Sequence, residues 1–203
     1  MWGFERVKAA QIDNSFPCRW QAEILRERPL ILPPRHFVYP SDAEEVERGA
    51  LEVLVRPGIE GAQPFLATCA LGFRDPAVPT GLWTTPEPEK FCAVSGGYAY
   101  LIDTEAPERF TMIPYRPVLD VRSVPANKSM PAGLLLFVGH RNILAWGAQG
   151  QAWESDKLSD EGVTITGIES SRLCGTGWEM LADKETPFVL DLCTGRSSRS
   201  SMS

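Results

Sequence analysis

The chain has 203 residues, of which 43% are apolar and 23% are charged. This composition excludes extensive disorder, and the length suits one medium domain or two small ones. The net charge of −6 excludes a surface that attracts nucleic acid over its whole area. Seventeen glycines and 17 prolines favour short elements separated by many turns.

Neither a membrane segment nor a cofactor signature is evident in the sequence. The longest strongly apolar run, residues 134–138, is far too short to cross a bilayer, and charges interrupt the N-terminus where a signal peptide would be apolar. The five cysteines lack redox or zinc spacing, and Cys69, Cys92 and Cys193 lie in apolar runs that predict buried free thiols. We expect a soluble cytoplasmic protein with no metal, no cofactor, no nucleic-acid partner and no membrane partner.

Residues 1–49 are predicted to form an irregular N-terminal segment that packs on the main domain. A short helix is expected over residues 20–27, with Trp20 and Ile24 on one face and Pro29 after its end. Residues 41–44 have the spacing of a capping box, which predicts a second short helix over 42–48. Residues 30–32 and 36–39 are expected to be extended.

From Ala50 onward the chain is a series of short apolar runs bounded by Gly, Pro or Asp, a pattern that predicts β-strands covered on both faces. The predicted strands lie near residues 50–56, 65–72, 81–84, 90–94, 98–103, 109–113, 118–124, 134–139, 142–147, 151–155, 163–168, 177–182 and 187–193. Residues 50–195 are therefore assigned to one β-repeat domain, and residues 196–203 to a flexible tail with nothing to bury.

The sequence repeats with a period of about 45 residues. Residues 91–102 align without gaps with residues 136–147 and with residues 181–192, and each segment has a polar turn before an apolar strand. About four short strands in a repeat of about 45 residues is typical of a β-propeller blade. Blade-like units are predicted near 91–135 and 136–180, with a partial unit after 181.

Two segments resemble blades of known propeller families. Residues 189–196, Val-Leu-Asp-Leu-Cys-Thr-Gly-Arg, are similar to the strand and Asp-x-x-Thr-Gly turn of quinoprotein-type blades. Residues 144–153 are similar to the same unit with a tryptophan after the turn, but lack its Asp and Thr, and the Trp-Asp pair of WD-type blades is absent. The resemblance implies an all-β fold of short antiparallel strands in a small or incomplete propeller. A β-sandwich or barrel is the alternative, because hairpins of similar length also generate self-similarity.

The repeat register supplies the prediction of a binding site. Ser95, His140 and Glu185 occupy equivalent positions near turns, and equivalent turns emerge at the same end of successive blades. We therefore expect these residues, with Arg141, to lie at one end of the domain and to bind a ligand. The acidic residues 156–161 have the wrong spacing for an EF-hand, and the glycines at 96–97 and 175–177 are interpreted as turns rather than phosphate loops.

The function favoured by the sequence is a non-enzymatic binding or scaffold domain that presents a turn-rich face to a protein or a small molecule. Two alternatives stay open. One is a carboxylate-based hydrolase or lyase acting on a carbohydrate, since the separation of catalytic carboxylates is spatial rather than sequential. The other is a structural protein that forms a homo-oligomer through the sheet edges that an incomplete ring leaves free.

Overall fold

The structure, a computed structural model, describes residues 10–41 and 49–199. Within these residues the chain forms 17 β-strands and no helix. The strands make four small, mostly antiparallel sheets, and none of these sheets closes into a barrel. The predicted all-β class is confirmed, and the arrangement is compatible with a propeller-like architecture.

The second, third and fourth sheets are each built around four strands that follow one another along the chain. The second sheet contains β6 (Gly81–Thr84), β7 (Lys90–Ser95), β8 (Tyr98–Asp103) and β9 (Phe110–Met112). The third contains β10 (Asp120–Val124), β11 (Leu134–Val138), β12 (Ile143–Gly147) and β13 (Gly150–Glu154). The fourth contains β14 (Val163–Glu169), β15 (Arg172–Glu179), β16 (Lys184–Asp191) and β17 (Ser197–Arg199).

The first sheet has a different connectivity. It comprises β2 (Trp20–Leu25), β3 (His36–Tyr39), β4 (Ala50–Pro57) and β5 (Phe65–Ala70), in the order β2-β4-β5-β3. Its edge strand β3 runs parallel to β5, and β1 (Gln11–Asp13) runs parallel to β6 at the edge of the second sheet. Segments from the first 49 residues therefore supply strands to the first two sheets.

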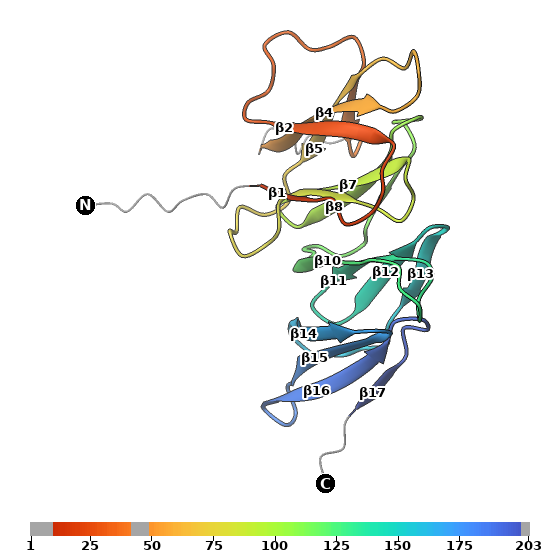
Figure 1. Cartoon of the computed structure of the whole chain (residues 1–203). Coiled ribbons are helices and arrows are strands. Elements are labelled where there is room, and N and C mark those ends of the chain that lie inside the picture. The colour runs from red at the N-terminus through yellow and green to blue at the C-terminus, as the bar shows by residue number, and fades with distance from the viewer. Residues whose placement is uncertain (1–9, 42–48, 200–203) are drawn as a thin grey trace, which may run out of the picture.

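The four sheets stack face to face in chain order, as Figure 1 shows from the red and orange strands to the blue ones. Three apolar clusters fill the spaces between successive sheets. The cluster between the second and third sheets contains Trp83, Leu101, Phe137 and Trp146, and Phe16 from the segment after β1 also contributes. Each pair of neighbouring sheets is held together by side chains from both.

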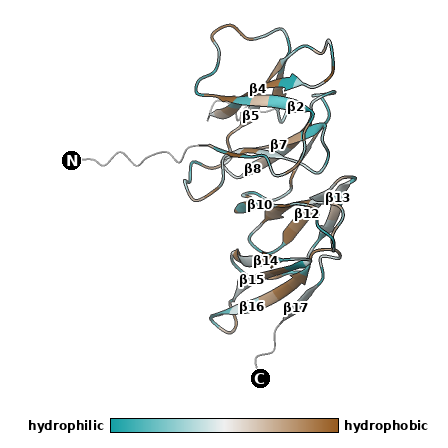
Figure 2. Cartoon of the chain, in the orientation of Figure 1, coloured by the Kyte–Doolittle hydropathy of each residue, from teal (hydrophilic) through white to brown (hydrophobic). Residues whose placement is uncertain are grey.

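Strands in the middle of the stack are buried on both faces, which explains their continuous apolar sequences. In β11, Leu135 and Phe137 point to one cluster, while Leu134, Leu136 and Val138 point to the next. Side chains of a strand alternate between its two faces, so all five positions of β11 are buried. Figure 2 shows the same pattern as an apolar β12 inside the stack and a more polar β2 at its end.

The helix predicted over residues 20–27 is wrong, because residues 20–25 form strand β2. Trp20, Ala22 and Ile24 pack against the cluster between the first two sheets, while Gln21 and Glu23 are exposed. Buried residues at every second position are typical of a strand with one buried face. Pairing with β4 selects this strand period of 2 over the helical period of 3.6. The helix predicted over 42–48 lies outside the described residues.

The glycines at 175 and 177, interpreted as a turn, lie inside β15 instead. A Cβ on Gly175 would sit 2.5 Å from the Phe188 ring, and one on Gly177 would sit 2.2 Å from the Leu158 carbonyl oxygen. Close approach of neighbours, rather than a turn, therefore requires these glycines. The flexible tail predicted from residue 196 also differs, since Ser197–Arg199 pair with β16 as β17.

Phe137→Ala should lower the free energy of unfolding by about 3–5 kcal/mol, because it leaves a cavity between the second and third sheets. Phe137 has no exposed surface, whereas Leu181 is 99% exposed and supplies the control variant, Leu181→Ala. The control should change stability by less than about 0.5 kcal/mol. Urea unfolding followed by fluorescence measures both, and similar losses in the two variants would contradict the stacking of the sheets.

Candidate functional site

The residues predicted to bind a ligand lie near the turns between the second and third strands of three successive sheets. Ser95 ends β7, His140 and Arg141 lie between β11 and β12, and Glu185 is the second residue of β16. The connections between sheets join each of these turns to the next one along the stack.

Backbone hydrogen bonds show the linkage. The N–H of Val118 donates to the Gly97 carbonyl at 2.8 Å, and the next N–H, of Leu119, donates to the Val138 carbonyl at 2.7 Å. The N–H of Leu158 donates to the Arg141 carbonyl at 2.7 Å. Two residues later, the Asp160 carboxylate accepts the backbone N–H of Met180, at the tip of the β15–β16 hairpin.

The four residues do not form one site. Ser95 is fully buried, and its hydroxyl has no hydrogen-bond partner among residues 10–41 and 49–199, so it does not face a ligand. His140 and Arg141 are exposed in their turn. The Asp160 carboxyl has a lowered pKa because it accepts hydrogen bonds from Lys157 and from the Met180 N–H, with a smaller effect from the Arg141 guanidinium. Glu185 lines a hollow.

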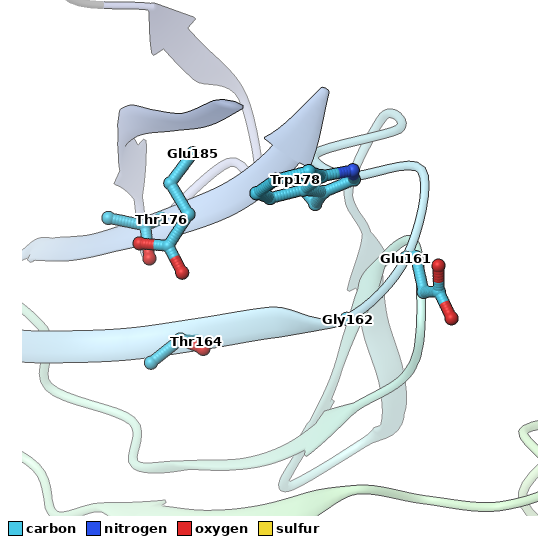
Figure 3. A pocket seen from close by; sticks show the side chains of 6 residues that line it. All are labelled: Glu161, Gly162, Thr164, Thr176, Trp178 and Glu185. Atoms are coloured by element: carbon cyan, nitrogen blue, oxygen red, sulfur yellow. The ribbon is translucent and has the colours of Figure 1, made fainter. Parts of the chain in front are cut away.

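The hollow at Glu185 lies on the outward face of the fourth sheet and has a volume of about 300 Å³. We call it the Trp178 hollow; its lining residues are Glu161, Gly162, Thr164, Thr176, Trp178 and Glu185. The strand register brings them together, because Thr164 pairs with Thr176 across β14 and β15, and Trp178 pairs with Glu185 across β15 and β16. Figure 3 shows the Trp178 ring between Glu185 on one side and Glu161 on the other.

The lining of the Trp178 hollow combines negatively charged carboxylates with an aromatic ring. Neither Glu161 nor Glu185 has an ion-pair partner in the described part of the chain, and no basic side chain lines the hollow. An indole face attracts cations through its quadrupole, and the carboxylates add direct charge attraction. The two threonines contribute hydroxyl groups, which both donate and accept hydrogen bonds.

A second hollow, of about 390 Å³, lies between the second sheet and Trp146 of β12. Three of its four charged lining residues, Lys90, Asp103 and Arg109, already have ion-pair partners. Glu87 accepts hydrogen bonds from Lys90 Nζ at 2.6 Å and from Trp146 Nε1 at 2.8 Å, and Asp103 pairs with Arg109 at 2.8 Å. These contacts orient the walls of the hollow and offer little uncompensated charge to a ligand.

A chain of polar side chains on the outward face of the first sheet was not evident from the sequence. The Thr68 hydroxyl donates to Glu52 Oε2 at 2.5 Å, so Nε2 of His36, 2.9 Å from that hydroxyl oxygen, is assigned as a donor. Thr68 is fully buried and Glu52 is 6% exposed. Burial, followed by the nearby Arg28 guanidinium, lowers the pKa of His36, and the opposing effect of Glu52 is smaller.

The cysteines give no indication of a reactive thiol or of a metal site. Burial raises the pKa of the Cys69 and Cys92 thiols, which makes them poor nucleophiles. Cys193, predicted to be buried, is exposed in the turn after β16. Among residues 10–41 and 49–199 there is no group of three or more His, Cys, Asp or Glu side chains that could hold a metal ion. The described residues also contain no helix long and apolar enough to span a membrane.

Comparisons with known proteins give no assignment: no family model matches the chain, and no curated protein matches it.

The His36 pKa predicts a pH dependence of stability. Because the folded protein binds this proton less tightly than the unfolded chain does, stability is full above the ordinary value of 6.5 and falls as the pH drops through it. His36→Gln should reduce that loss between about pH 7.5 and about pH 5.5 in urea unfolding. His140→Gln, which removes an exposed histidine, is the control, and equal slopes in all three proteins would contradict the assignment.

Proposed function

We propose that the chain is a non-enzymatic binding domain and that the Trp178 hollow binds a cationic group of its ligand. The observation that carries this proposal is the pair of carboxylates, Glu161 and Glu185, that flank an indole without a basic neighbour in the hollow. The proposal includes blade-like repeats as the scaffold, since a stack of short sheets holds its outermost face rigidly.

The ligand chemistry follows from the lining residues. A cation over the Trp178 ring gains about 0.5–1 kcal/mol at an exposed site, and the carboxylate of Glu185 would contribute by direct charge attraction. An anion would face two negative charges. A neutral sugar could stack on the indole, but it would leave the charge of both carboxylates unused.

The alternative of a carboxylate-based hydrolase has one observation in its favour, because two carboxylates line the same hollow. The position of the hollow favours the binding domain instead. It lies on an outward sheet face, whereas the general acid of such a hydrolase is held protonated by an apolar surrounding or by a neighbouring carboxylate.

The proposal predicts that N-acetyl-argininamide shifts the NMR resonance of the Trp178 indole N–H, and that the neutral citrulline analogue does not. Trp178→Ala should weaken binding of the arginine compound, followed by the backbone amide resonances of Thr164 and Thr176, by about fivefold, the equivalent of about 1 kcal/mol. Glu185→Gln should weaken it similarly, because it removes one charge at nearly constant shape.

The matched control is Glu169→Gln, which removes an exposed carboxylate on β14 that does not line the hollow. Its affinity for N-acetyl-argininamide should equal that of the wild type. Equal shifts with the arginine and citrulline compounds would show that charge is not what the hollow recognises, and the proposal would fail.

A further inference from the structure

The two ends of the stack each expose large apolar side chains. In the loop after β2, Leu30, Ile31 and Leu32 are 104%, 89% and 40% exposed. At the tip of the β15–β16 hairpin, Met180 and Leu181 are 64% and 99% exposed. Neighbouring exposed residues of this size are uncommon on a protein surface that contacts only water, and they indicate an interaction surface.

These surfaces lie at opposite ends of the molecule. Figure 1 shows the loop after β2, in orange-red, beyond the first sheet, and the β15–β16 hairpin, in blue, at the far end of the stack. The Trp178 hollow adjoins the hairpin, because Trp178 lies in β15 two residues before Met180. The apolar tip and the anionic hollow therefore form one continuous surface at the end of the fourth sheet, which we call the tail surface.

The loop carries the charge that the tail surface lacks. Arg26, Arg28 and Arg35 flank the apolar run of the loop, and with Glu27 between the first two arginines the loop keeps a net positive charge. Arg28 approaches Glu52 at 3.9 Å, and Arg35 donates to the Gln63 carbonyl at 2.9 Å. Arg26 is exposed and has no ion pair or hydrogen bond in the described part of the chain. The loop after β2, which is basic and apolar, thus lies at one end of the molecule. The tail surface, which is acidic and apolar, lies at the other end.

We infer that the partner of the tail surface is a second copy of this chain, which docks head to tail through its loop of residues 26–32. This inference rests on the proposed function, because it places the Arg26 guanidinium of the second copy in the Trp178 hollow beside Glu185. Leu30 and Ile31 of that copy then pack against Met180 and Leu181.

Charge selects this arrangement over symmetric pairing. A loop-to-loop contact would set two loops of net positive charge against each other, and a tail-to-tail contact would set Glu161 and Glu185 against their own copies. Only the head-to-tail contact pairs opposite charges while covering both apolar runs. It also continues along the stack the face-to-face arrangement of sheets that the chain uses between its own sheets. Such a contact is heterologous, so the copies associate by repeated use of one interface.

A charge swap tests the inference by sedimentation velocity over about a hundredfold range of concentration. The wild type should show a sedimentation coefficient that rises with concentration. Arg26→Glu and Glu185→Arg should each remain monomeric, since each sets like charges against one another at the interface. An equimolar mixture of the two variants should associate again, because every contact between unlike copies then pairs opposite charges.

Leu30→Ser/Ile31→Ser should also abolish association, while Ile59→Ser, which removes an exposed apolar residue from the β4–β5 turn, should not. A wild type that stays monomeric at every concentration overturns the inference, as does a mixture of the charge variants that stays monomeric. If the wild type is monomeric but N-acetyl-argininamide still shifts the Trp178 indole resonance, the proposed function stands without this partner. If neither effect is seen, both fail.

Discussion

The burial of apolar side chains between successive sheets is the interaction on which the rest of the structure depends. A sheet of four short strands with both faces in water has no core of its own, and here every such sheet obtains one from its neighbours. The second and third sheets are covered twice, which is why strands such as β7, β8, β11 and β12 are apolar at nearly every position. Loss of one cluster would therefore expose two sheets rather than one.

The same constraint explains where a binding surface can form. The outward face of the fourth sheet has no sheet against it, and it carries Thr164, Thr176 and Trp178 in place of the leucines and valines of the inner faces. Polar residues on a terminal face keep it hydrated. An indole held among them by the register with β16 is a rigid platform, because its strand is fixed from below by the cluster around Phe188 and Leu190.

How far the sequence predicts the fold varies with burial. Residues 134–139 and 142–147 are predicted within a residue of β11 and β12, because apolar runs buried on both faces end sharply at turns. The strand predicted at 177–182 misses β15 by several residues, since a strand with one wet face has a weaker signal and its in-strand glycines imitate a turn. Residues 20–25 were open to a helical interpretation because six residues cannot separate periods of 2 and 3.6 until a partner strand is known.

The candidate site shows a different limit of sequence reasoning. The register of about 45 residues locates Glu185 near a turn, and it assigns Ser95 to an equivalent turn of the same binding face. The tight Gly96–Gly97 turn instead leaves Ser95 inside the core. Trp178 was missed because a tryptophan in a strand faces the core or the solvent depending on a one-residue choice of register. The sequence shows which residues carry a charge or an aromatic ring, but cross-strand pairing determines which of them lie side by side. In this chain the pairing of β15 with β16 sets the Trp178 indole opposite the Glu185 carboxylate. Both lie on the outward face of the fourth sheet, which no neighbouring sheet covers.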